Sequence, residues 1–409
     1  MAVPHIQIKD YDYALPASRI AQFPVEQRDE SKVLIWKEGK ITESIFARIG
    51  NDLPANCILV FNDTKVIHAR LIFSKNTGAT IEVFCVEPVL PVTEIQASFA
   101  QTASCIWKCL VGNVKRWKEG MLVKSFILEG KSYLLSAEKK ETLGDGCFSI
   151  KFKWEPSELS FSQILDLAGM VPLPPYITRP STSLDSDRYQ TIYAKHEGSV
   201  AAPTAGLHFT EQTMESLKKK NISFKNVTLH VGIGTFRPVS VENIGLHIMH
   251  SEKVSVKLEV IKDLAGNMKK SVFAIGTTSV RTLESLYWLG IKIIVDGDRR
   301  HPEIHQWDAY NSIYDRNIPC SEAMSALANY VEKTGNKTYT GDTALMIVPG
   351  YRFRIVEGMV TNFHMPQSTL LLLITAFIGE SWKTVYQYAL EHDFRFLSYG
   401  DACLFFRKE

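Results

Sequence analysis

The stretch VFAIGTTSVRTLESLYWL, residues 272–289, decides the fold class. Its first four residues form a short apolar run typical of a buried strand, and an amphipathic helical pattern starts near Val280. The small polar residues 276–279 lie between the two. A strand, a small-residue turn and a helix N-terminus predict an α/β domain whose turn can hold a carboxylate or a phosphate. The glycine spacing matches neither a phosphate loop nor a dinucleotide-binding motif.

The same rhythm continues outward from this stretch. Strands are expected at 33–36, 58–61, 227–233 and 402–406, and helices at 210–220, 280–289 and 370–377. By contrast, residues 71–154 read as strands only, at 80–86, 110–114, 121–128, 131–136 and 147–154. We therefore predict a discontinuous α/β main domain, 1–70 and 155–409, with an inserted all-β, barrel-like domain at 71–154. Residues 311–343 are expected to form a surface helix and a loop.

Composition and charge narrow the function classes. The 409 residues are 45% hydrophobic and 22% charged, which is typical of a globular chain and excludes disorder as the main state. The longest apolar run, 370–378, is far shorter than the ~20 residues that span a bilayer, and a cytoplasmic location is expected. The seven cysteines contain no Cys-x-x-Cys pair, which argues for reduced thiols. A net charge of +2 permits a nucleic-acid partner without requiring one.

Two segments place polar groups beside small residues. Alternation in VTLHVGIG, residues 227–234, turns His230 away from the core, and Gly232 with Gly234 allows a ligand close to the backbone or else marks a bulged strand end. The run AAPTAGLHFT, residues 201–210, contains Thr204 and Gly206 and ends at a helix N-cap, where free amides can bind an anion. His208 in this run is either a neighbour of the cap or an acid/base group.

A third segment offers three possible metal ligands. His247, His250 and Glu252 lie within six residues, but their spacing does not match the zinc helix His-Glu-x-x-His, and Gly245 argues against a long helix. We predict no metal there and favour a structural role, or else proton transfer or hydrogen bonding to a substrate.

Three further places carry candidate polar groups. The turn TNFHMP, residues 361–366, precedes an apolar helix, and its Asn362 and His364 are expected to face a pocket. Asp401, in the turn 398–401, is either a ligand-binding carboxylate or an ordinary turn residue. Arg281 and Glu284 share a helical face, so either the two pair with each other or Arg281 binds an anion.

These segments belong to a longer series of motifs. The series includes YDY at 11–13, FND at 61–63, PLPPYI at 172–177, YQT at 189–191, residues 202–209, 229–236 and 274–284, PGY at 349–351, residues 361–370 and residues 398–402. Together they resemble the S-adenosylmethionine:tRNA ribosyltransferase-isomerases of queuosine biosynthesis (the QueA family), over most of the chain. The chain departs from this pattern at His68, where the family usually has proline, and in longer stretches at 88–104 and 311–340. The resemblance implies an α/β domain with an inserted β-barrel.

The resemblance also implies a reaction. S-adenosylmethionine gives its ribosyl group to the aminomethyl group of a 7-deazaguanine base at the wobble position of tRNA. Adenine and methionine leave, and epoxyqueuosine remains. Such chemistry needs a base for a proton beside the sulfonium and a proton donor for adenine. S-adenosylmethionine is then a consumed substrate, no cofactor is expected, and the expected partners are this substrate and tRNA, with no membrane partner and a monomeric enzyme.

Candidate roles follow from that reaction. Proton transfer is assigned to His208, His230, His250 and His364. Substrate binding is assigned to Asp63, Thr204, Gly206, Gly232, Gly234, Thr277, Thr278, Ser279, Arg281, Asn362 and Asp401. Within this set, the turn 277–279 and Arg281 suit the methionine carboxylate, and Asp63 or Asp401 suits the ribose hydroxyls. Contacts to tRNA phosphates are assigned to Arg179, Arg188, Lys195 and Arg237. Three other functions stay open, namely a metal-dependent hydrolase built on the segment 247–252, a tRNA-binding relative without catalysis, and a diverged relative that acts on another base or on a free nucleoside.

Overall fold

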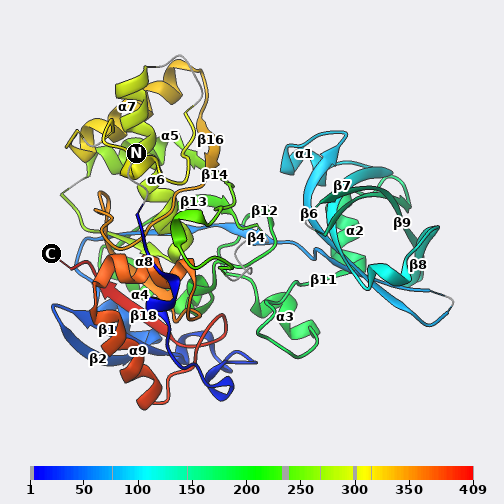
Figure 1. Ribbon diagram of the computed structural model, residues 1–409, viewed down its shortest axis with the longest axis horizontal. Coiled ribbons are helices and arrows are strands. Elements are labelled where there is room, and N and C mark those ends of the chain that lie inside the picture. The colour runs from blue at the N-terminus through cyan, green and yellow to red at the C-terminus, as the bar shows by residue number, and fades with distance from the viewer. Residues whose placement is uncertain are drawn as a thin grey trace.

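The structure is a computed structural model that describes residues 4–75, 77–144, 146–232, 239–267, 269–297, 302–314 and 316–408. It is a mixed α/β protein with two large sheets, which lie at opposite ends of the long axis in Figure 1. Gly234 and Arg237 lie outside the described residues. Within the described ranges, no helix combines the length and the apolar content that a membrane crossing requires.

The larger sheet has nine strands in the order β16-β14-β13-β3-β15-β17-β18-β1-β2. At its centre β13, β3, β15 and β17 run parallel, so their carboxyl ends lie at one edge. β18 runs antiparallel to β17 and therefore begins at that same edge. The strands are β1 (Lys32–Lys37), β2 (Lys40–Ile45), β3 (Ile58–Asn62), β13 (Ser223–His230), β14 (Glu252–Lys257), β15 (Val272–Ile275), β16 (Thr338–Thr343), β17 (Val356–Asn362) and β18 (Ala402–Phe406).

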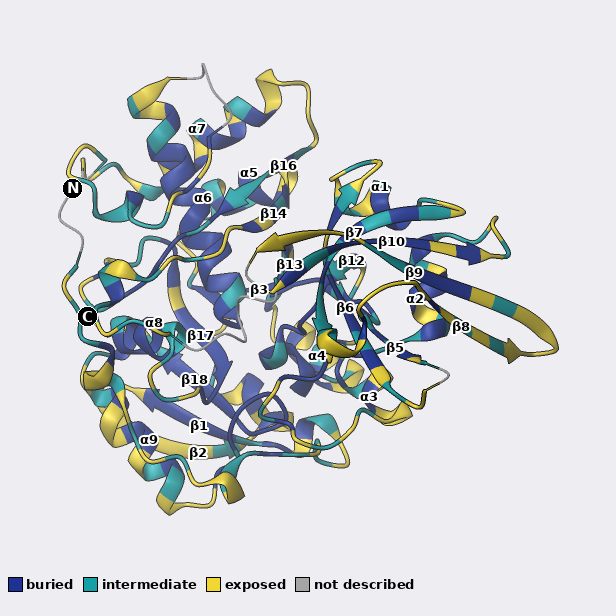
Figure 2. Cartoon of the chain, turned by 45° about the vertical axis from the view of Figure 1, so that its right-hand side comes forward, coloured by how far each residue is buried: buried dark blue, intermediate teal, exposed yellow. Residues whose placement is uncertain are grey.

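Helices cover both faces of this sheet, because successive side chains of a buried strand point to opposite sides. Along β3, Ile58 and Val60 pack with the helices of one face, while Leu59 and Phe61 pack with α4 on the other. α6 is buried along most of its length, as Figure 2 shows. The helices of the main domain are α3 (Ser183–Arg188), α4 (Glu211–Lys219), α5 (Leu258–Gly266), α6 (Thr277–Asp296), α7 (Cys320–Lys333), α8 (Thr369–Ile378) and α9 (Ser381–Glu391).

The second sheet has seven antiparallel strands in the order β11-β5-β6-β7-β10-β9-β8 and curls into a half-barrel (Figure 1). Its concave side holds a separate core that includes Trp107, Phe152 and Phe161. The elements are β5 (Arg70–Ser74), β6 (Thr80–Leu90), α1 (Ile95–Phe99), β7 (Ser104–Gly112), β8 (Met121–Leu128), β9 (Lys131–Gly144), β10 (Cys147–Glu155), α2 (Phe161–Ala168) and β11 (Gly169–Met170). A short pair, β4 (Thr64–Val66) and β12 (His196–Ser199), lies between the two sheets in Figure 1.

Several expected elements are confirmed, since a strand is found at each of 121–128, 272–275 and 402–406. One expectation is wrong in part. Residues 311–343 contain not only the helix α7 but also the edge strand β16, which pairs with β14. An edge strand is covered on one side only and can therefore be polar, as the sequence TYTGDT of β16 is. This sequence lacks the apolar run by which a buried strand is predicted.

Candidate functional site

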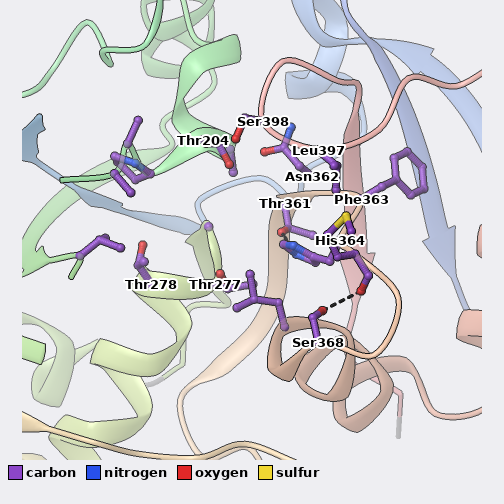
Figure 3. A pocket seen from close by; sticks show the side chains of 18 of the residues that line it. Thr204, Thr277, Thr278, Thr361, Asn362, Phe363, His364, Ser368, Leu397 and Ser398 are labelled. Atoms are coloured by element: carbon purple, nitrogen blue, oxygen red, sulfur yellow. Dashed lines mark hydrogen bonds between the residues drawn. The ribbon is translucent and has the colours of Figure 1, made fainter. Parts of the chain in front are cut away.

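A pocket opens at the edge where the central strands of the main sheet end. This is the usual position of a ligand site in an α/β sheet. The pocket spans about 880 Å³ together with its mouth. Figure 3 shows Thr277 and Thr278 on one side of it and Asn362, His364 and Ser368 on the other. Its lining is Tyr176, Tyr189, Ala201, Ala202, Pro203, Thr204, Ala205, Val231, Gly276, Thr277, Thr278, Thr361, Asn362, Phe363, His364, Met365, Ser368, Thr369, Leu370, Leu397 and Ser398.

The N-terminus of α6 forms one wall. Gly276 lies at φ +87°, a conformation that favours glycine, and turns the chain from β15 directly into the helix without a side-chain cap. Amides of the first helical turn have no partner within a helix, so an uncapped N-terminus can bind an anion. The hydroxyl of Thr278 is held by Asn62, whose Nδ2 lies 3.3 Å away. Ser279 faces away from the pocket, because its Oγ donates to the carbonyl of Ile275.

Asn362 connects the pocket to His208. Its Nδ2 lies 3.1 Å from Nε2 of His208 and 3.4 Å from the carbonyl oxygen of Asp401. The other ring nitrogen of His208 lies 2.7 Å from Oγ of Ser31. Burial, then the positive charges of Arg395 and Arg28, lower the pKa of His208 to about 3. The imidazole is therefore neutral near pH 7.

His364 lies on the opposite side of the pocket from α6 (Figure 3). Its Nε2 is 2.9 Å from Oγ1 of Thr361, and burial lowers its pKa to about 3. His208 and His364 thus reach the same end of β17 from different segments. The prediction that Asn362 and His364 face a pocket is confirmed.

His230 faces a second cleft, of about 460 Å³, which the main sheet shares with the β6 segment of the second sheet. Its Nδ1 lies 2.9 Å from Oγ1 of Thr64, and burial lowers its pKa to about 4. Gly232 also lines this cleft. Val231 borders both the cleft and the pocket, so the two spaces are neighbours.

Asp63 and Asp401 are both buried and both bonded within the protein. Asp63 accepts a 2.6 Å hydrogen bond from Thr228, and burial raises its pKa above the usual range. The two carboxylate oxygens of Asp401 accept the backbone amides of Lys32 and Arg395. In this conformation neither carboxylate lines the pocket. A direct contact with ribose hydroxyls therefore requires these bonds to rearrange.

Of the two alternatives for Arg281, the ion pair with Glu284 does not form. Arg281 pairs with Glu252 of the neighbouring β14, and both side chains are buried. Glu284 instead accepts backbone amides from 354–356 and the hydroxyl of Tyr351. The spacing of three residues favours a pair on an exposed helical face. Here that face of α6 is buried, and both side chains bond to residues of other segments instead.

Other predicted residues have different neighbours. A Cβ at Gly206 would overlap the hydroxyl of Tyr193, so this glycine permits close packing beneath the pocket rather than contact within it. His250 is exposed just before β14 and lies outside the pocket lining. Glu252 is bonded to Arg281 and so is not available as a metal ligand. The described residues contain no cluster of three side chains suited to hold a metal ion.

The basic residues assigned to tRNA differ in their availability. Arg179 makes two 2.7 Å contacts with the buried carboxylate of Asp185 and stacks on the ring of Phe23. Arg188 donates to two backbone carbonyls, those of residues 25 and 26. Lys195 is exposed beside the site, and its backbone amide donates to the carbonyl of Asp63.

Some residues of the site were missed from sequence. Three residues form hydrogen bonds with side chains that the sequence did predict: Ser31 with His208, Asn62 with Thr278 and Thr64 with His230. Asn62 belongs to the FND motif at 61–63 and Thr64 follows it directly, so the motif was a usable signal. Ser31 is 177 residues from its partner and has no local signal.

Fold and site thus define an α/β protein with a pocket at the carboxyl edge of its main sheet. The family model described as queuosine biosynthesis protein matches residues 8–405. The chain therefore belongs to this family.

Similar proteins carry one name. The S-adenosylmethionine:tRNA ribosyltransferase-isomerase of Trichlorobacter lovleyi is 36% identical over 97% of this chain and 99% of its own length. That of Thermotoga petrophila is 37% identical over 98% and 99%. The crystal structure of S-adenosylmethionine tRNA ribosyltransferase from Thermotoga maritima matches with a TM-score of 0.46 and 29% identity, over 97% of this chain and 99% of that one.

Proposed function

We propose that the chain is an S-adenosylmethionine:tRNA ribosyltransferase-isomerase. It transfers and isomerises the ribosyl group of S-adenosylmethionine onto the 7-aminomethyl-7-deazaguanine wobble base of tRNA, giving epoxyqueuosine with release of adenine and methionine. The observation that carries the proposal is the near full-length identity of 36–37% to enzymes of that name. S-adenosylmethionine is a consumed substrate in this proposal, and the protein acts as a monomer in the cytoplasm.

The pocket supports the proposal by its chemistry. S-adenosylmethionine combines an amino acid, a sulfonium, a ribose and a base, so its site needs amides, hydroxyls and apolar surface together. The lining supplies hydroxyls from Thr204 and Ser398, free amides at the start of α6, and apolar contact from Leu370 and Leu397. The neighbouring cleft with His230 gives the acceptor base a separate approach to the same region.

Proton transfer in this proposal is assigned to His364, which lines the pocket, and to His208, which contacts the lining residue Asn362. His208 and His364 are neutral near pH 7, so each ring has one N–H and one acceptor nitrogen. A neutral imidazole can accept the proton beside the sulfonium, and an imidazole protonated in this way can give a proton to departing adenine. The assignment of His208 is tested by the kinetics of single variants.

The domain assignment is also part of the proposal. The main domain, 1–70 and 155–409, holds the pocket, and the insertion at 71–154 contributes the β6 side of the cleft. An acceptor base that enters between the two sheets would contact both domains. The curled sheet itself extends beyond the insertion, because β11 at 169–170 pairs with β5.

The test incubates the purified chain with S-adenosylmethionine and tRNA that carries the 7-aminomethyl-7-deazaguanine wobble base. Adenine and methionine are quantified, and the digested nucleoside is identified by mass. We expect both products in equal amounts together with epoxyqueuosine. Binding of the tRNA without release of either product would overturn the proposal in favour of a tRNA-binding relative without catalysis.

A further inference from the structure

The pocket at the end of β17 offers hydrogen-bond donors and acceptors but no charged side chain. None of its described lining residues is an aspartate, glutamate, lysine or arginine. Burial also keeps His364 neutral near pH 7. A ligand with a net charge would lose water here without meeting a counter-charge, at a high cost in free energy. A zwitterionic group has no net charge, so its two charges compensate each other in such a pocket.

The negative charge has a place at α6. This helix has 20 residues, and its N-cap, Gly276, offers no side chain to the first amides. The contrast with α8, whose N-terminus also borders the pocket, is clear, because Ser368 caps α8 by accepting the amide of Leu371. The α6 amides are thus available to a carboxylate, which the helix dipole also attracts.

The positive charge has a place at Asn362. This side chain is 3% exposed, and its Oδ1 has no hydrogen-bond partner among the described residues. The carbonyl oxygen of Asp401 can only accept a hydrogen bond, so the amide nitrogen of Asn362 must face it and the oxygen must face the other way. Figure 3 shows this oxygen on the side of Thr204. A buried acceptor without a partner is costly, and a ligand N–H group would satisfy it.

The two places are neighbours in the sheet. β15 and β17 are adjacent and parallel, with Ile275 paired to Val360, so the α6 N-terminus and Asn362 follow the strands at the same edge. Adjacent strands are about 4.8 Å apart. An α-amino acid carries its carboxylate and its ammonium on one carbon, and it can reach both places at once. The amino group of adenine and the carboxylate of S-adenosylmethionine lie at opposite ends of the molecule and cannot.

We propose that this pocket binds the α-amino acid end of S-adenosylmethionine, with the carboxylate on the first amides of α6 and the ammonium on Oδ1 of Asn362. The proposal rests on the proposed function and specifies which half of the substrate this pocket holds. The apolar side chains of Met365, Leu370 and Leu397 then lie beside the side-chain methylene groups, and the charged sulfonium lies outside this subsite. The adenosine half extends out of this subsite.

The first experiment tests the ammonium contact by calorimetry on the full chain. L-methionine is compared with 4-(methylthio)butanoic acid, which lacks only the ammonium, in the parent chain, in Asn362→Leu and in Asn362→Asp. The parent chain should bind L-methionine about 10-fold or more tightly than the acid, the value of a hydrogen bond to a charged group. Asn362→Leu should bind the two alike, whereas Asn362→Asp, which keeps an oxygen there, should still prefer L-methionine.

The second experiment tests the carboxylate contact. L-methioninamide lacks the negative charge and is compared with L-methionine in Thr277→Pro and Thr277→Ala. Proline is tolerated at the first helical position and removes one amide N–H, whereas alanine removes the side chain and keeps that N–H. Thr277→Ala should keep the preference for L-methionine, and Thr277→Pro should lose about 10-fold of it.

Each comparison is a double-mutant cycle in which one change is made in the ligand and one in the protein. A variant that weakens the binding of both ligands equally leaves their affinity ratio unchanged. Equal binding of L-methionine and the deaminated acid to the parent chain overturns the proposal. So does the absence of L-methionine binding up to ~10 mM, or competition between adenosine and L-methionine for one site. If these results occur while adenine and methionine are still released from S-adenosylmethionine and tRNA, the proposed function stands and only this subsite assignment fails.

Discussion

His208 accepts a hydrogen bond from Asn362 at Nε2, across 3.1 Å. The same amide nitrogen of Asn362 faces the carbonyl of Asp401, which fixes it as the donor. Nε2 of His208 must then be unprotonated, and its proton lies on Nδ1 toward Ser31, 2.7 Å away. A single tautomer of His208 is thus set by residues from three distant segments.

This tautomer gives a prediction about turnover. His208→Ala should lower the rate of adenine release about 100-fold or more, if the imidazole transfers a proton. Ser31→Ala keeps the ring but frees its orientation, and a smaller loss is expected. Single-turnover kinetics with saturating S-adenosylmethionine measures both. Turnover near that of the parent chain in a folded His208→Ala variant would remove His208 from the catalytic residues.

Buried histidines give a second prediction, about stability in acid. The pKa of His208 and His364 is lowered to about 3, and that of His230 to about 4, whereas the unfolded value is 6.5. Between pH 6.5 and about 4 the unfolded chain binds more protons, so each group lowers the free energy of unfolding as pH falls, by up to about 1.4 kcal/mol per pH unit. Asp63 acts with the opposite sign, because its folded pKa is raised.

The measurement is therefore a difference between two proteins. Urea unfolding of the parent chain and of His208→Asn is compared at several pH values from 7.5 to 5. The variant should lose less stability toward acid, because it lacks one buried imidazole. Parallel curves for the two proteins would mean that His208 is as easily protonated in the folded chain as in the unfolded one.

The strands that were predicted well share a property. Residues 272–275 and 402–406 are apolar runs between clear turn residues, so their boundaries can be seen locally. The polar edge strand β16 lacks such a run and was missed. Likewise, the motifs identified Asn362, His364 and Thr278 as pocket residues, because turns at strand ends carry binding groups.

Partners across the chain could not be predicted in this way. Glu252 and Arg281 are 29 residues apart. From the sequence, Arg281 had the nearer partner Glu284, and Glu252 was a possible metal ligand. Only the packing of β14 against α6 brings them together in the core. The same holds for Ser31 and His208, whose contact depends on the whole topology of the sheet.

The pair of Glu252 and Arg281 leads to a third prediction. Both side chains are at most 7% exposed, so removal of one leaves a buried charge without its partner. Glu252→Ala should lower the free energy of unfolding by about 3–5 kcal/mol. The exposed Glu242→Ala serves as the control and should change it by less than about 0.5 kcal/mol. Urea unfolding measures both, and equal stability of the two variants would refute the structural role.

A fourth prediction separates this role from a metal site. Chelation with EDTA should leave adenine release unchanged, because the carboxylate of Glu252 is bonded to Arg281 and His250 is exposed. Metal analysis of the purified chain, with the rate before and after dialysis, provides the measurement. Loss of the rate on chelation and its return with zinc would favour the metal-dependent hydrolase.

The last prediction concerns tRNA. The exposed Lys195 lies beside the site, so Lys195→Ala should weaken tRNA binding and lower the slope of log affinity against log salt by about 1, as for one lost phosphate contact. Arg179 is committed to the buried Asp185, so Arg179→Ala should mainly cost stability, by about 3–5 kcal/mol. Salt titrations of tRNA binding and urea unfolding distinguish the two. A full loss of salt slope in a stable Arg179→Ala variant would show instead that its guanidinium leaves Asp185 to bind a phosphate.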